Sequence, residues 1–178
     1  MASKIKVDQI QTGDGTGTIA LQNQLSGMTT ASLPALGAAQ MPAGSVLQVI
    51  TAEDSSTLSL SSTTYTDTSL SAAITPSSSS SKILVFWSVH SRTQATNAGF
   101  GTKLLRGSTA VWTTAQPYYV YNTDTADQRN STEFKYLDSP STTSAVTYKV
   151  QVSSHSGNLT SFNDNGNQSS ILLMEIAG

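Results

Sequence analysis

The chain has 178 residues, enough for one domain of roughly 100–150 residues and an appendage. Only 11% of the residues are charged, the formal net charge is −2, and the nine lysines and arginines are scattered singly, which argues against a nucleic-acid partner and an anionic membrane surface. Low charge also argues against a disordered chain, and the cysteine-free sequence removes disulfides, thiolate catalysis and cysteine-based zinc sites.

The N-terminal residues MASKIKVDQIQ contain no apolar stretch of signal-peptide length. The longest apolar runs, ILVFW and ILLM, are far too short to span a membrane. We therefore expect a product made in the cytoplasm, without membrane insertion, that reaches the outside by a route such as cell lysis.

The first element in chain order is IKVDQIQTGDGTGTIALQN at positions 5–23, where two runs with alternate apolar residues flank GDGTG. The spacing fits neither a phosphate loop nor a dinucleotide loop, and Asp8 and Asp14 offer too few oxygens for calcium. Asp-Gly between such runs predicts a β-hairpin, which two strands alone cannot stabilise. We expect copies of this arm to pack around a symmetry axis. The side chains expected at that contact are Ile5, Val7, Ile10, Ile19, Leu21, Leu25 and Met28.

A linker follows the arm, because AAQMPAG at positions 38–44 is rich in small residues, Gly and Pro. We therefore predict an N-terminal arm, anchor and linker over residues 1–44 and a C-terminal head domain over residues 45–178.

Beyond this boundary the apolar residues recur with a period of two. In AVTYKVQV, Val146, Tyr148, Val150 and Val152 point one way, which predicts a strand with one dry face. KILVFWSV is apolar at nearly every position, which predicts a central strand buried on both sides.

The last predicted strand, SSILLMEIA, has apolar residues on both faces. Leu172, Met174 and Ile176 share one face, and Ile171 and Leu173 share the other. A second apolar face at the C-terminus predicts a subunit contact through Ile171 and Leu173. Turn clusters rich in Ser, Asn and Gly separate about eight to ten strands without a convincing long helix. The fold class is therefore all-β, a β-sandwich or barrel and most plausibly a jelly roll.

No motif predicts catalysis. His90 and His155 are the only histidines, and a serine near either is uninformative in a chain with 54 Ser and Thr residues. A glycosidase needs two carboxylates about 5–10 Å apart, whereas the two acids on predicted strands, Glu133 and Glu175, are distant in sequence. NDNGN at positions 163–167 is interpreted as a hairpin tip rather than a metal loop. We expect no cofactor and no metal.

One aromatic cluster, VWTTAQPYYVYN, lies between predicted strands. Aromatic side chains in such a loop often stack on sugar rings or anchor an interface, so Trp112, Tyr118, Tyr119 and Tyr121 are candidate receptor contacts. The alternative is that half of them alternate into the core.

The segments SKIKVDQIQTGDGTGTIALQNQLSGMTTASLP, PAGSVLQVI, SSKILVFWSV, TKLLRGSTAV, LDSPSTTSAVTYKVQVSS and SSILLMEI resemble structural appendage proteins of marine tailed bacteriophages, particularly those infecting cyanobacteria. The resemblance covers nearly the whole chain. It implies a homotrimer, an N-terminal arm that docks on the tail or capsid, and a head similar to tumour-necrosis-factor-like sandwiches. It implies no catalytic residue.

The arm is short for a long tail fibre, so a short fibre, a fibre tip or a capsid decoration fits best. We expect a virion fibre or spike, made in the host cytoplasm and released by lysis, that binds host-surface polysaccharide. The alternatives are a capsid decoration or cement protein without a receptor role, a small depolymerase, and a free-standing bacterial lectin.

Overall fold

The computed structural model describes residues 37–114, 120–125 and 127–178. Residues Gly37–Gly178 form a compact unit of their own. The predicted hairpin at 5–23 and all seven predicted arm contacts, Ile5 to Met28, lie outside the described residues, as do Tyr118 and Tyr119.

The described part of the chain consists of strands and two single-turn 3₁₀ segments, and none of its helices is long and apolar enough to cross a membrane. The 3₁₀ segments are η2 (Ala38–Gln40) and η3 (Asp164–Gly166). The strands are β1 (Val46–Asp54), β2 (Leu58–Leu60), β3 (Thr66–Ile74), β4 (Lys82–Thr93), β5 (Ala98–Arg106), β6 (Thr109–Thr113), β7 (Val120–Asn122), β8 (Gln128–Asp138), β9 (Val146–Ser154), β10 (Thr160–Phe162) and β11 (Ser169–Ile176).

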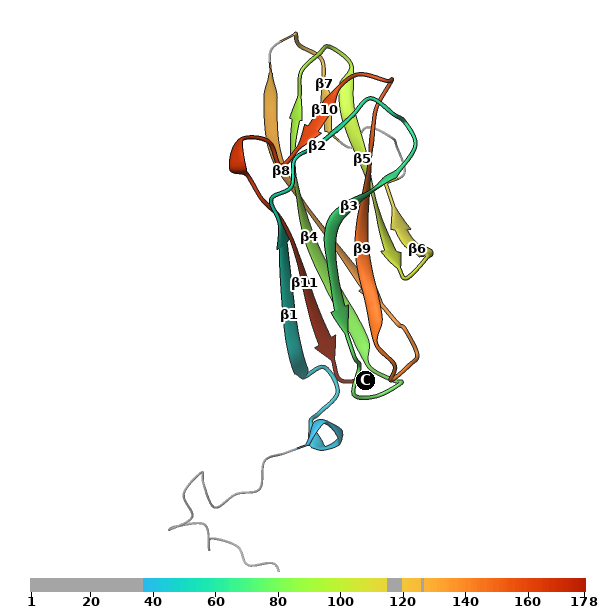
Figure 1. Cartoon of the computed structure of the whole chain (residues 1–178). Helices are drawn as coiled ribbons and strands as arrows, with labels where there is room; N and C mark the ends of the chain where they lie inside the picture. The colour runs from blue at the N-terminus through green and yellow to red at the C-terminus, as the bar shows by residue number, and fades with distance from the viewer. Residues whose placement is uncertain (1–36, 115–119, 126) are drawn as a thin grey trace, which may run out of the picture. The chain divides into compact units, whose positions relative to one another are not determined.

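Two antiparallel sheets pack face to face (Figure 1). In the first sheet, β8 pairs along one edge of β4, while β11 and β10 pair along its other edge and are followed by β1 and β2. In the second sheet, β3 pairs with β9 and β9 with β5, whose far edge pairs with β6 and β7. The prediction of an all-β sandwich is confirmed.

The strand order is that of a jelly roll. Three strand positions are interrupted, so that β1 with β2, β6 with β7, and β10 with β11 each occupy one position in a sheet. Numbered along the chain, the resulting positions pair first with last, second with seventh, third with sixth and fourth with fifth. This nested pairing is what folding one long antiparallel hairpin over itself produces.

Alternate residues of facing strands fill the space between the sheets. Ile83, Val85, Trp87 and Val89 of β4 are buried, and so are Tyr148, Val150 and Val152 of β9, as the period-two pattern predicted. The prediction that β4 is buried on both sides is wrong: Phe86 is 39% exposed, and Leu84 is only half-buried. A two-layer sandwich gives each sheet one inner face, so a central strand can still be open on the other side.

The faces of β11 are the reverse of the prediction. Ile171 and Leu173 are 1% and 0% exposed in the core of their own chain, so their predicted role as a subunit contact is wrong. Leu172, Met174 and Ile176 point outward and stay half-buried. The inward face also carries Glu175, a charged residue that makes this face look the more polar in sequence.

Two buried carboxylates join the layers. Asp138 of β8 accepts hydrogen bonds from Arg106 of β5 at 2.9 and 3.0 Å and from the Tyr148 hydroxyl of β9 at 2.6 Å. Burial and the neighbouring Asp138 raise the pKa of Tyr148, so this hydroxyl stays a donor.

Glu175 of β11 is the second buried carboxylate, and it is fully buried. It accepts hydrogen bonds from the Ser77 backbone N–H at 2.7 Å, the Ser77 hydroxyl at 2.6 Å and Gln48 Nε2 at 2.6 Å. Burial by itself raises the pKa of Glu175, but the donors, led by Ser77, outweigh burial and hold the pKa below its usual value. The charged carboxylate thus fastens the β3–β4 turn to β1 and β11.

Replacing Ser77 with Ala should destabilise the protein at neutral pH by about 1.5–3 kcal/mol, because a charge-assisted hydrogen bond to a buried group is lost. A carboxyl group whose pKa is lowered by folding stabilises the fold at pH values above its unfolded-state pKa of about 4.3. This stabilisation is lost as the pH falls through the folded-state pKa. The deficit of Ser77→Ala should therefore shrink below about pH 4. Chemical denaturation at both pH values measures it, with Ser79→Ala in the same turn as control. An equal deficit at both pH values would contradict the role of the Glu175 charge.

Candidate functional site

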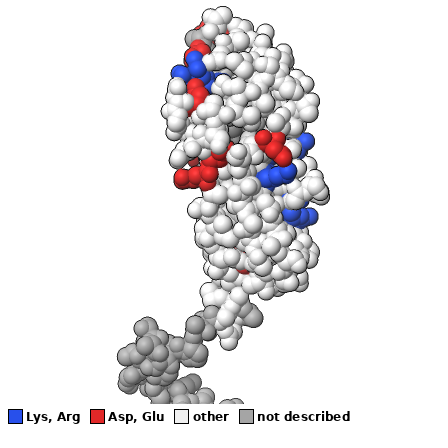
Figure 2. Space-filling view, viewed as in Figure 1, with Lys and Arg blue, Asp and Glu red and all other residues white. Residues whose placement is uncertain are grey.

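The two ends of the sandwich differ in what they carry. At one end, here called the basal end, the chain enters at Gly37, and Gly44 N–H donates to the Ala177 carbonyl at 2.7 Å next to the C-terminus (Figure 1). The opposite end, here called the distal end, carries the β2–β3, β4–β5, β7–β8 and β9–β10 connections. On the face seen in Figure 2, charged side chains occur in small groups, and the basal end is nearly free of them.

The distal connections are tied to one another by backbone hydrogen bonds. Asn97 N–H donates to the Asn122 carbonyl at 2.7 Å, and His155 N–H donates to the Gly99 carbonyl at 2.9 Å. Asn158 Nδ2 donates to the Thr96 carbonyl at 3.2 Å. Asn97 itself has a φ of 63°, in the left-handed region that Asn tolerates better than most residues. These bonds hold three loops as one surface.

Among the described residues of this surface, Tyr121 is the exposed aromatic side chain. It is 40% exposed, its hydroxyl donates to Asn97 Oδ1, and its ring meets the His155 ring edge-on at 5.6 Å between centroids. This partly exposed ring is held by a hydrogen bond and an aromatic contact and lies among amide and hydroxyl groups. This arrangement suits stacking on a sugar ring.

Trp112, predicted as a receptor contact, is half-buried and packs against the core. Its ring lies 5.1 Å from Trp87 in an edge-to-face arrangement and 5.4 Å from Phe134. Because Trp112 is on β6 and Phe134 on β8, the three rings close the gap between the two sheets along one side. The alternative that part of the aromatic cluster alternates into the core is thus correct for Trp112.

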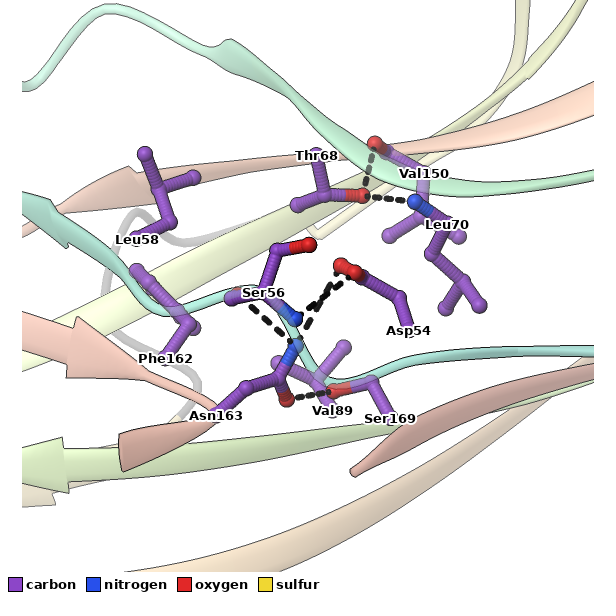
Figure 3. Close-up of a pocket in the computed structure, with 10 residues that line it drawn as sticks. All are labelled: Asp54, Ser56, Leu58, Thr68, Leu70, Val89, Val150, Phe162, Asn163 and Ser169. Atoms are coloured by element: carbon purple, nitrogen blue, oxygen red, sulfur yellow. Dashed lines mark hydrogen bonds between the residues drawn. The ribbon is translucent and has the colours of Figure 1, made fainter. Parts of the chain in front are cut away.

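The strand interruptions enclose a small cavity of about 10 Å³ (Figure 3). Asn163 is its organising residue: its Nδ2 donates to Asp54 Oδ2 at 3.3 Å and to the Ser56 carbonyl at 3.4 Å, and its Oδ1 accepts from Ser169 Oγ at 2.6 Å. A space of this size holds about one water, so it serves the fold rather than a ligand. The prediction that NDNGN is a hairpin tip is wrong, because the segment is a loop between β10 and β11, which both pair with β4.

Asp164, next in this loop, compensates a charge conflict between strands. Arg92 of β4 and Arg129 of β8 stand directly opposite each other in the sheet, where like charges destabilise a strand pair. Asp164 Oδ2 lies 3.5 Å from Arg92 and 3.8 Å from Arg129, and Asp127 pairs with Arg92. No pattern in the sequence indicated this cluster, because its members come from three separate segments.

The residues weighed for catalysis are not brought together. Glu133 is exposed on the outer face of β8, whereas Glu175 points into the interior, so these carboxylates lie on opposite faces of the first sheet. His90 lies 3.9 Å from Asp164, and His155 is in the distal loops. Among the described residues, no group of three or more His, Asp or Glu side chains is placed to hold a metal ion.

No protein-family model matches the chain, and no curated protein matches it. Among solved structures, a chain in the structure of infectious bursal disease virus, Gx strain, is similar to this one. The alignment covers 74% of this chain and 32% of the viral chain, at 17% identity and a TM-score of 0.48. The VP2 subviral particle of infectious bursal disease virus aligns with 82% of this chain and 38% of its own at 16% identity and a TM-score of 0.46. The chain thus spans about a third of the length of these proteins.

Replacing Asn163 with Ala should destabilise the protein by about 2–4 kcal/mol, because buried partners lose their hydrogen bonds and Ala must adopt the left-handed backbone at a φ of 53°. Asn165→Ala is the matched control, since Asn165 has a φ of 56° but is exposed, and it should cost only about 1 kcal/mol. Thermal and chemical denaturation of the three proteins measure the difference. Equal losses would show that backbone conformation, not the side-chain network, sets the stability of this loop.

Proposed function

We propose that this protein is a bacteriophage virion structural protein, a homotrimeric fibre or spike that attaches to the particle through its N-terminal arm and binds host-surface polysaccharide through its head. The observation that supports the proposal is that the two ends of the sandwich carry different features. The head begins at Gly37 at the basal end, and strand β7, which carries Tyr121, lies with its loops at the distal end. The resemblance of the sequence to phage appendage proteins supports the same assignment.

The chemistry of the distal surface supports a glycan ligand. Tyr121 supplies an apolar face, while Asn97, Asn158 and His155 surround it with groups that can exchange hydrogen bonds with hydroxyls. One such site binds weakly. Three sites in a trimer and several trimers on a particle give avidity without strong single contacts.

Replacing Tyr121 with Ala should lower binding of the full chain to host cells by about tenfold or more, because removing an aromatic anchor costs more than 1 kcal/mol at each site. Fluorescently labelled protein applied to a panel of cyanobacterial strains measures the binding, and unlabelled protein should block adsorption of the phage. Thr109→Ala, a change at an exposed position at the start of β6, should bind as the parent does.

Two results would contradict the receptor role. Binding that is unchanged in Tyr121→Ala would remove the distal loops as the contact. Free protein that neither binds cells nor blocks adsorption, together with antibody labelling of the capsid shell rather than the tail, would assign the protein to capsid decoration instead.

A further inference from the structure

The outer face of the first sheet is divided along the strand direction into an apolar half and a polar half. Strand register sets the rows. Val49 of β1, Met174 of β11, Leu84 of β4 and Leu137 of β8 stand side by side in one row. The next row toward the distal end contains Thr51, Leu172, Phe86 and Lys135. The six apolar members of these rows, Val49, Leu84, Phe86, Leu137, Leu172 and Met174, are called the basal patch.

The basal patch contains half of the exposed large hydrophobic side chains of the described residues. Six large hydrophobic side chains are exposed among the described residues. Three of them belong to the patch, namely Val49 at 51%, Leu137 at 49% and Phe86 at 39%, and Val46 at 50% borders it. The other two, Tyr121 and Leu159, lie at the distal end. A contiguous apolar area on a folded domain marks a contact surface.

The rows beyond the patch are polar. The next row contains Glu53, Ser170, Ser88 and Glu133, and farther out Arg92 faces Arg129. The apolar surface is therefore confined to the end at which the arm joins the head. Copies placed side by side with all their arms at one end would bring patch to patch and polar row to polar row. An antiparallel arrangement would set the patch of one copy against the charges of the next.

The edges of the patch differ in charge. Lys135 lies on β8, at one edge of the sheet, and Glu53 lies on β1, at the opposite edge and one row farther toward the distal end. In a ring of copies, the β8 side of one copy meets the β1 side of the next, so Glu53 of one copy comes near Lys135 of its neighbour and also near Glu133, which shares the row of Glu53. The apolar rows, rather than the charges at the rim, therefore carry the contact.

We propose that the basal patch is the contact between copies of this chain, arranged around an axis parallel to the strands with the β8 edge of each copy against the β1 edge of its neighbour. This inference rests on the proposed trimer and adds the surface that forms it. Such a heterologous contact closes into a ring of three when each copy is rotated by one third of a turn from its neighbour.

The first test replaces Phe86 with Asp in the full chain. The side chain points away from the core, so the fold should be kept, which circular dichroism and the melting temperature check. Light scattering should show the mass falling to one third of the parent's, because a charge is buried in an apolar contact. Ser131→Asp, on the polar half of the same face, should remain a trimer.

The second test uses the cysteine-free sequence. A double variant, Glu53→Cys with Lys135→Cys, treated with a flexible bismaleimide, should give a covalent three-chain product, because each chain is joined to both neighbours. Either single variant can give no more than two joined chains. A double variant that also stops at two chains would overturn the proposed arrangement.

The two proposals fail in different ways. A parent trimer that persists in Phe86→Asp overturns the basal patch as the contact but leaves the trimeric fibre intact, with assembly assigned to another part of the chain. A parent chain that is itself monomeric overturns both the contact and the trimeric part of the proposed function.

Discussion

The head depends on the pairing of β4 with strands on both of its edges. β8 follows one edge over its whole length, while β11 and β10 share the other, so β4 fixes the positions of three strands that are distant from it in sequence. From its inner face, Trp87 contacts Phe134 and Trp112 and thereby closes one side of the sandwich. From its outer face, Leu84 and Phe86 join the neighbouring strands in an apolar surface. One strand thus determines both the core and the basal patch.

The interruptions of the strands are as important as the strands. If β10 and β11 were one continuous strand, Asn163 would be a strand residue. The loop between them instead places Asn163 and Asp164 in contact with β1 and β4. Asn163 forms hydrogen bonds with buried polar groups. Asp164 pairs with two arginines that the strand register places opposite each other. Polar side chains in these loops therefore stabilise a chain that has only a small charged fraction.

Buried polar groups also fix how the layers meet. Asp138 connects β8 with β5 and β9, and Glu175 connects β11 with the β3–β4 turn and β1. A buried carboxylate is tolerated only where its lone pairs are satisfied, so each of these groups accepts one arrangement of its neighbours. Both lie toward the basal end, where the arm joins the head and where a firm base suits a contact between copies.

The sequence by itself determined the fold class, because the period of two in segments such as AVTYKVQV is a local property that any sandwich strand must obey. It also located an aromatic cluster, and it signalled a second apolar face at the C-terminus. It could not determine which face of β11 is inside, since Leu172 and Leu173 are equally apolar and a buried Glu175 is permitted only by donors from distant segments. It could not distinguish Trp112, which packs against the core, from Tyr121, which is exposed, because that difference depends on Trp87 and Phe134 lying beside Trp112. Only the tertiary structure decided these points, since burial is a property of contacts between strands and not of a strand alone.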